Sequence, residues 1–172
     1  MDTSAKRCLF FIDVQSGFVE PGTTQPIIPH LEQLARDFEG EFVLATKFVN
    51  RDGSGFTDIM GWHGLKDERE TALLPFVEAC ADFIIEKNTY SACSDEVMKI
   101  LTEKGITEVI LASIDTDCCV LATATSLFEH NIRPVVLEKY CASTGGAASH
   151  AAGIRVLNRL IGAAQLPTAW YP

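Results

Sequence analysis

The hydrophobic residues of this chain gather in short runs separated by longer amphipathic stretches. Five continuous apolar runs occupy residues 8–12, 42–45, 83–85, 109–112 and 135–137. An uninterrupted run of this length is typical of a strand that is buried on both faces. The runs therefore predict the strands of a mostly parallel sheet, and residues 169–170 are a candidate for a sixth strand.

Amphipathic stretches lie between or after these runs, and their apolar residues recur with helical spacing. In chain order the four sets are Leu31, Leu34, Ala35 and Phe38; Val97, Ile100 and Leu101; Val120, Ala124, Leu127 and Phe128; and Ile154, Leu157, Leu160 and Ile161. Strands that alternate with helices build parallel sheets covered by helices on both faces. The pattern predicts an α/β fold, a three-layer α/β/α sandwich with a mostly parallel five- or six-stranded sheet, in a single domain over residues 1–172.

Chemically useful side chains follow the predicted strands. Asp13 comes directly after the first run, Lys87 after the third, and Cys118 and Cys119 after the fourth, where Thr116 is the expected N-cap of a helix. In sheets of this kind ligands bind beyond the carboxyl ends of the strands. Residues 50–66 form the longest segment without a clear period, and irregular segments of this length are often functional.

The three residue types make a reagent set when they are combined. Free amides and the positive end of a helix dipole favour a thiolate, and the same amides can receive an oxyanion. A nearby carboxylate can take the thiol proton, and a lysine can offset the negative charge. Taken singly, Cys119 reads as a small core residue, Asp13 as a turn acid and Lys87 as a surface lysine. Because successive helical residues lie about 100° apart, we expect only one of the two thiols to face a cleft.

Composition and charge exclude several classes of function. The chain has 14 Lys and Arg against 23 Asp and Glu, a formal charge of −9, which argues against nucleic acid and anionic membranes as partners. The six cysteines include no C-x-x-C pair and are too few for a disulfide scaffold. We find no signal-peptide pattern and no membrane-span pattern, and we therefore expect a cytoplasmic protein with reduced thiols.

Three sequence motifs carry a family resemblance. They read IDVQSGFV at residues 12–19, EKNTYSAC at 86–93 and IDTDCCVLATA at 114–124. In order and spacing they resemble the isochorismatase-like cysteine hydrolases, which include nicotinamidases and carbamoylsarcosine-type amidases, over nearly the whole chain. The resemblance implies a Rossmann-like strand order and Cys119, which precedes Val, as the nucleophile. It gives Asp13 and Lys87 the other two catalytic roles.

The same resemblance implies further features of the site. It implies a cis peptide bond between Ile114 and Asp115, oxyanion donors at the amides of Asp115 and Cys119, and a homo-oligomer. Family nicotinamidases also hold a metal through an Asp-x-His segment. Here Asp52 is followed at that spacing by Ser54, and the nearby Asp58 and His63 make too few ligands for a site. We therefore predict no metal and no cofactor.

These observations predict a metal-independent hydrolase that cleaves an amide C–N bond of a small molecule through a thioester on Cys119. Candidates for its pocket wall are Phe18, Phe48, Phe56, Trp62 and Tyr90. Two alternatives stay open. One is an isochorismate-type vinyl-ether hydrolase that does not need the thiol, and the other is a non-enzymatic binding or redox-sensing member of the fold. The sequence does not name the substrate.

Overall fold

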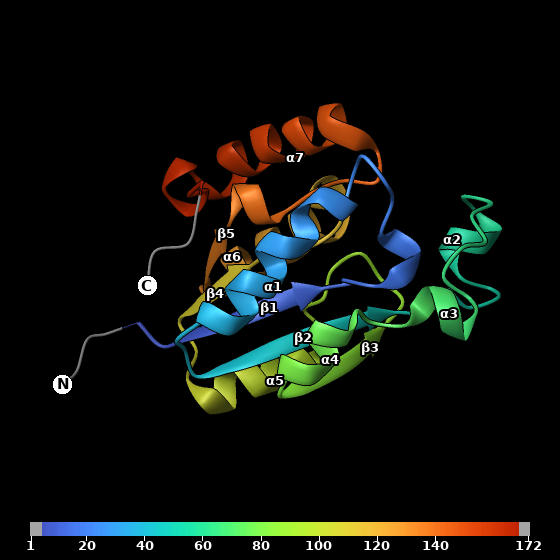
Figure 1. Ribbon diagram of the computed structural model, residues 1–172. Helices are drawn as coiled ribbons and strands as arrows, with labels where there is room; N and C mark the ends of the chain where they lie inside the picture. Colours follow the sequence, from blue (N-terminus) through green and yellow to red (C-terminus); the bar gives the residue numbers. More distant parts are fainter. Residues whose placement is uncertain (1–4, 169–172) are drawn as a thin grey trace.

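A five-stranded parallel sheet forms the centre of the computed structural model, which describes residues 5–168 (Figure 1). Its strands are β1 (Arg7–Ile12), β2 (Phe42–Phe48), β3 (Phe83–Lys87), β4 (Glu108–Leu111) and β5 (Arg133–Val136), in the order β3-β2-β1-β4-β5. The strand order reverses at β1, which pairs with both β2 and β4. This confirms the expected Rossmann-like sheet. The candidate sixth strand at 169–170 lies outside the described residues.

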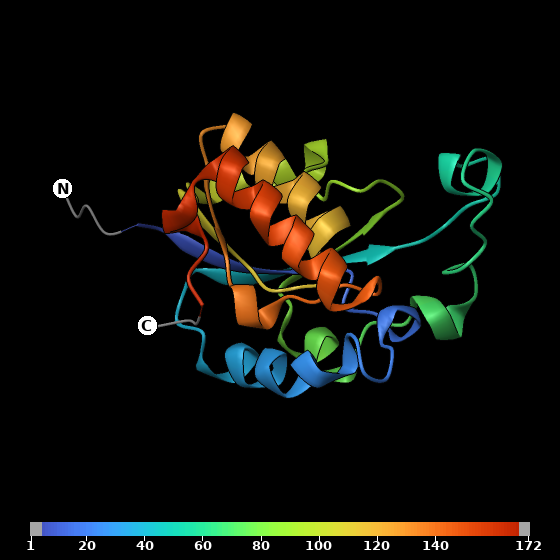
Figure 2. The same cartoon turned by 90° about the horizontal axis from the view of Figure 1, so that it is seen from above.

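Helices cover both faces of the sheet, which confirms the three-layer sandwich. Helices α1 (Ile28–Asp37) and α4 (Pro75–Cys80) lie on one face, and α5 (Asp95–Lys104), α6 (Leu121–Glu129) and α7 (Gly146–Ile161) lie on the other (Figure 2). The short helices are α2 (Gly55–Asp58), α3 (Glu68–Thr71), a π-helical turn at Thr116–Val120, and 3-10 turns at Ser16–Phe18, Gln25–Ile27, Glu138–Tyr140 and Ala163–Gln165.

The core is divided by the sheet into two clusters, as the alternation of side chains along a strand requires. Within β1, Cys8, Phe10 and Ile12 belong to the cluster that contains residues of α5, α6 and α7. Leu9 and Phe11 belong to the cluster that contains residues of α1 and α4. All five side chains are fully buried, which explains why this central strand is a continuous apolar run.

Some expectations from the hydrophobic pattern were wrong. Ile84 is 45% exposed because β3 is an edge strand, so this run is not buried on both faces. Phe128 and Leu160 are also exposed, since each lies on the outer side of its helix. Strand β2 continues to Phe48 because it stays paired with β3 up to Lys87, so Thr46 lies inside the strand rather than after it.

The carboxyl ends of the strands open toward a lobe that projects from the body of the molecule. This lobe contains α2 and α3 and is drawn in blue-green to green at the right of Figure 1. It corresponds to most of the irregular 50–66 segment and the residues after it. None of the helices among residues 5–168 is both long and apolar enough to span a bilayer.

Candidate active site

Asp13 lies at the carboxyl end of β1, and its carboxylate is fully buried. Its backbone has φ +56°, a left-handed conformation that non-glycine residues seldom adopt and that occurs preferentially at functional sites. Thr46 Oγ1 donates a hydrogen bond of 2.8 Å to Oδ1. Lys87 Nζ lies 2.6 Å from Oδ2, which has no hydrogen-bond partner of good geometry among the described residues. One carboxylate oxygen is thus fixed, and the other is paired only by charge.

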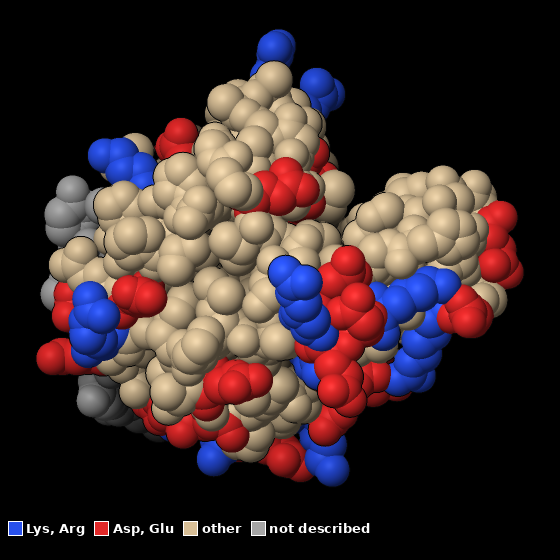
Figure 3. All heavy atoms as spheres, turned by 45° about the vertical axis from the view of Figure 1, so that its right-hand side comes forward, with Lys and Arg blue, Asp and Glu red and all other residues tan. Residues whose placement is uncertain are grey.

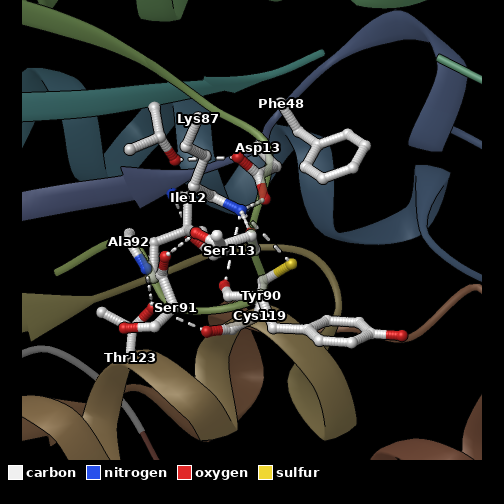
Figure 4. A network of polar contacts seen from close by, with 12 residues as sticks. Ile12, Asp13, Phe48, Lys87, Tyr90, Ser91, Ala92, Ser113, Cys119 and Thr123 are labelled. Carbon is white, nitrogen blue, oxygen red and sulfur yellow. Dashed lines mark hydrogen bonds and ion pairs between the residues drawn. The ribbon is translucent and has the colours of Figure 1, made fainter. Parts of the chain in front are cut away.

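Lys87 joins Asp13 to Cys119 (Figure 4). It is the last residue of β3, and its ammonium donates to the carbonyl oxygens of Thr89 at 2.7 Å and Tyr90 at 3.4 Å. It also lies 3.6 Å from Cys119 Sγ and 5.1 Å from the centre of the Phe48 ring. These contacts hold a buried cation between the carboxylate and the thiol.

Cys119 lies in the π-helical turn that precedes α6. The Val120 amide donates to the Asp115 carbonyl at 3.1 Å, the i to i+5 bond that defines such a turn. The N-cap is therefore Asp115 rather than the expected Thr116. Thr123 Oγ1 donates to the Cys119 carbonyl at 2.7 Å and accepts from the Ala92 amide at 2.9 Å. Thr123 thus ties the cysteine turn to the loop after β3.

The segment between β4 and this turn is fixed by polar contacts. The peptide bond between Ile114 and Asp115 is cis. The Asp115 carboxylate accepts hydrogen bonds from the Thr144 amide at 2.6 Å and the Thr144 hydroxyl at 2.7 Å. Buried Ser113 accepts from the Ile12 amide, so the ends of β1 and β4 are joined beneath the site.

The sequence suggested a thiolate at rest, but the pKa shifts at the site favour a protonated thiol. Burial, and then the negative charge of Asp13, raise the pKa of Cys119 well above its usual value, and the opposing charge of Lys87 does not compensate. Burial also raises the pKa of Asp13, against the charge and hydrogen bond of Lys87 and further hydrogen bonds from Cys119 and Thr46. The thiol is therefore protonated at rest, and the carboxylate that would receive its proton is held beside it by Lys87.

A cavity of about 260 Å³ lies over the thiol. Its wall includes the five aromatic side chains named from the sequence, which are Phe18, Phe48, Phe56, Trp62 and Tyr90. These rings pack against one another, with Phe18 and Trp62 stacked at 6.2 Å between centroids and Phe56 edge-on to Tyr90 at 5.0 Å. Both Cys118 and Cys119 line the cavity, so the expectation that only one thiol faces it was wrong. The two are successive residues of a turn wider than an α-helix, and the cavity spans both.

The residues that align with the family's metal segment do not fit a metal. Asp52 is paired with Lys66, and the Ser54 hydroxyl caps α2 by accepting from the Thr57 amide at 3.2 Å. His63 is exposed. Within residues 5–168 no group of three or more His, Cys, Asp and Glu side chains is placed to hold a metal ion.

Comparison with known proteins identifies the family. The model of the Isochorismatase domain family matches residues 7–169. The chain belongs to the isochorismatase family. This is a family of hydrolases, and the match covers every strand of the sheet. No curated protein matches the chain.

Solved structures share the fold. An isochorismatase-like hydrolase from Alkaliphilus metalliredigens is 24% identical, with a TM-score of 0.80 and 95% of each chain covered. N-carbamoylsarcosine amidase from Thermoplasma acidophilum is 22% identical, with a TM-score of 0.75 and 94% of each chain covered. Pyrazinamidase of Pyrococcus horikoshii, solved in complex with zinc, is 18% identical, with a TM-score of 0.81 and coverage of 96% of this chain and 99% of that one.

The sequence did not reveal the residues that support the site. Thr46 and Thr123 bond directly to Asp13 and Cys119, and Thr144 holds Asp115. One signal was available for Thr46, a polar residue that directly follows an apolar run. Thr123 and Thr144 act through contacts between distant segments, which periodicity does not report.

Proposed function

We propose that this protein is a cysteine hydrolase that cleaves a C–N bond of a small amide through a thioester on Cys119. The observation that carries the proposal is the position of the Lys87 ammonium, 2.6 Å from Asp13 Oδ2 and 3.6 Å from Cys119 Sγ, under a cavity of about 260 Å³. A carboxylate, a cation and a thiol within contact distance are the parts that nucleophilic catalysis needs.

The proposed reaction begins with proton transfer from Cys119 to Asp13. The thiol starts protonated because its pKa is raised, and burial also raises the pKa of Asp13, which makes the carboxylate a stronger base toward that proton. The sulfur attacks the amide carbonyl, and the negative charge on the carbonyl oxygen is received by amides at the start of the π-helical turn, with those of Asp115 and Cys119 as candidates.

The second half of the proposed reaction returns the enzyme to its starting state. The protonated Asp13 gives its proton to the departing nitrogen, so that ammonia or an amine leaves and the acyl group stays on Cys119. Asp13 then takes a proton from water, and the hydroxide attacks the thioester carbonyl. As the C–S bond breaks, the acid is released and Asp13 returns the proton to the Cys119 sulfur. Lys87 keeps its proton throughout and limits the cost of the changing charges.

One observation favours the vinyl-ether alternative. The buried carboxyl of Asp13 has a raised pKa, and a protonated carboxyl is what proton donation to a vinyl ether requires. In that reaction the thiol is dispensable, so the two functions predict opposite results for a variant that lacks it.

The decisive experiment replaces Cys119 by Ala. Ammonia release from a panel of small primary amides should fall to background in Cys119→Ala, and mass spectrometry of the wild type should find an acyl adduct on Cys119. Cys80→Ala is the matched control, because Cys80 is a half-exposed free thiol in α4, on the opposite side of the sheet from Cys119. Hydrolysis of a vinyl ether that survives in Cys119→Ala would support the alternative. If neither class of substrate reacts, the protein is not a hydrolase of these bonds.

A further inference from the structure

The wall of the candidate active site carries acidic side chains and no basic ones among the described residues. Glu20 and Asp115 both line the cavity. The remaining lining residues are Gly17, Phe18, Phe48, Phe56, Met60, Trp62, Tyr90, Cys118, Cys119 and Thr144, none of which is Lys, Arg or His. Burial raises the pKa of Asp115, hydrogen bonds from Thr144 lower it, and the charges of Asp117 and then Glu20 raise it by smaller amounts. The cavity therefore has a negative wall.

Three cations near the cavity are paired, and a fourth, Arg69 of α3, lies in a neighbouring cavity that shares Gly17 with this one. Lys87 lies below it and is neutralised by Asp13 at 2.6 Å. On the projecting lobe, Arg51 is paired with Glu86, and Lys66 is paired with Asp52. In Figure 3 the lobe stands apart from the body, and both acidic and basic side chains lie at the base of the notch between them. An anionic group that enters the cavity would thus meet two carboxylates and no basic side chain among the lining residues.

The aromatic side chains add a second, independent feature that suits a cation. The electron-rich faces of Trp, Tyr and Phe attract ammonium groups within about 6 Å of the ring centre. Phe48 already has such a partner, since Lys87 Nζ lies 5.1 Å from its centroid. Trp62 and Tyr90 belong to the same wall, and Tyr90 is 41% exposed. Aromatic faces together with carboxylates are the combination that recognises organic cations.

The size of the cavity limits the substrate. At about 260 Å³ it lies just below the roughly 300–1,000 Å³ of sites for drug-sized ligands. We infer that the substrate is a small amide that carries a positively charged nitrogen a few bonds away from the scissile carbonyl. This inference rests on the proposed function for its chemistry, and on the lining of the cavity for its charge.

Three amides of equal length test the inference. They are 5-aminopentanamide, hexanamide and adipamate, which are cationic, neutral and anionic at the end distant from the amide. We expect kcat/KM to fall in that order, with about a tenfold difference between the cation and the neutral amide. Glu20→Gln should reduce this ratio at least threefold, whereas Glu103→Gln on the exposed surface of α5 should leave it unchanged. A preference for adipamate, or a ratio that Glu20→Gln does not alter, would overturn the inference.

A thiol probe tests the same inference without hydrolysis. In Cys119→Ala, Cys118 is the one thiol that remains in the described wall, and it can be modified with 2-aminoethyl or 2-sulfonatoethyl methanethiosulfonate. Its sulfur displaces methanesulfinate and forms a mixed disulfide. The ratio of the modification rate with the cationic reagent to that with the anionic reagent should be about tenfold higher for Cys118 than for free 2-mercaptoethanol. This ratio should fall in 0.5 M salt. An equal or inverted ratio rejects a cation-selective cavity. A raised ratio with no amide hydrolysed would retain a cation-selective cavity and reject the proposed function, and with it an amide as the substrate.

Discussion

Asp13 has two opposite effects on Cys119, and one substitution separates them. Its negative charge and its hydrogen bond both raise the pKa of the thiol, while its carboxylate is the proposed acceptor of the thiol proton. The residue that makes the resting thiol less acidic is thus the one that the reaction needs.

Asp13→Asn should therefore lower the pKa of Cys119 and still stop hydrolysis. Removal of the charge leaves Lys87 unopposed beside the sulfur, so site-resolved alkylation of Cys119 with iodoacetamide should reach its midpoint at a lower pH than in the wild type. Loss of a general base costs about 10²–10⁴ in rate, and kcat/KM should fall in that range. A midpoint that moves to higher pH, or a variant with normal kcat/KM, would contradict this role.

Thr46 tunes the same carboxylate from the other side. Its hydroxyl donates 2.8 Å to Asp13 Oδ1 and lowers the pKa of that carboxyl. Thr46→Val keeps nearly the same shape but removes the donor, so the pKa of Asp13 rises further and the ionised base appears only at higher pH. The acid limb of the kcat/KM profile should move upward, and the buried unpaired oxygen should cost about 1–3 kcal/mol of stability.

A surface threonine provides the control for this change. Thr102 is exposed on α5, and its hydroxyl donates 2.8 Å to the Met98 carbonyl. Thr102→Val should leave the pH profile in place and change the unfolding free energy by less than about 0.5 kcal/mol, as is usual for surface substitutions. An unmoved acid limb in Thr46→Val would mean that Asp13 does not control it.

At the scale of elements, the cysteine turn is positioned by close contact with α7. A Cβ added at Gly153 would lie 2.9 Å from both the backbone N and the Cα of Asp117, two residues before Cys119. Neither atom belongs to a side chain that can rotate away. The close packing of α7 on the turn therefore depends on the absence of a side chain at this position.

Gly153→Ala should displace the turn and so reduce both stability and activity. Overpacking of this kind costs about 1–3 kcal/mol, measurable by urea unfolding, and kcat/KM should fall because Cys119 moves with Asp117. Gly55→Ala is the matched helical control, since its Cβ would meet nothing closer than Ile59 Cδ1 at 3.8 Å. It should be neutral or stabilising by about 0.4–1 kcal/mol. Equal behaviour of the two variants would rule out this contact as a constraint on the site.

The elements also show what a sequence can and cannot predict. Strand β1 was predictable because burial on both faces gives a continuous apolar run, and helix α7 was predictable because burial of one face gives a helical periodicity. The projecting lobe was not, because distant contacts position it. Gln15 is fully buried, and its side chain bonds to the backbone of Phe48 at 2.7 and 2.9 Å and of Thr71 at 2.8 Å. One side chain thus joins the end of β2 to α3, a relation that no local pattern encodes.

For the whole molecule, the same distinction explains the candidate site. Asp13, Lys87 and Cys119 were predictable because each follows or ends a strand, and parallel strands bring their carboxyl ends to one edge of the sheet. The high pKa of Cys119 was not predictable, because it depends on how completely the folded chain excludes water around the thiol. The same distinction applies to charge. The net charge of −9 could be used to exclude classes of partner, but the sequence does not show that Glu20 and Asp115 line one cavity.

The six free cysteines provide a test of the entire fold in one experiment. Cys8 and Cys141 are buried, and burial raises the pKa of each to about 12, while Cys80, Cys93 and Cys118 are half-exposed. Brief treatment of the native, substrate-free protein with iodoacetamide at pH 8 should therefore modify the half-exposed three first. Cys8 lies in the central strand, so its alkylation should require global opening and should track the unfolding curve in urea. Cys119 should also react slowly, because its thiol is protonated and covered. If Cys119 reacts fastest of the six without substrate, its resting state is a thiolate, and the coupled proton transfer to Asp13 is wrong.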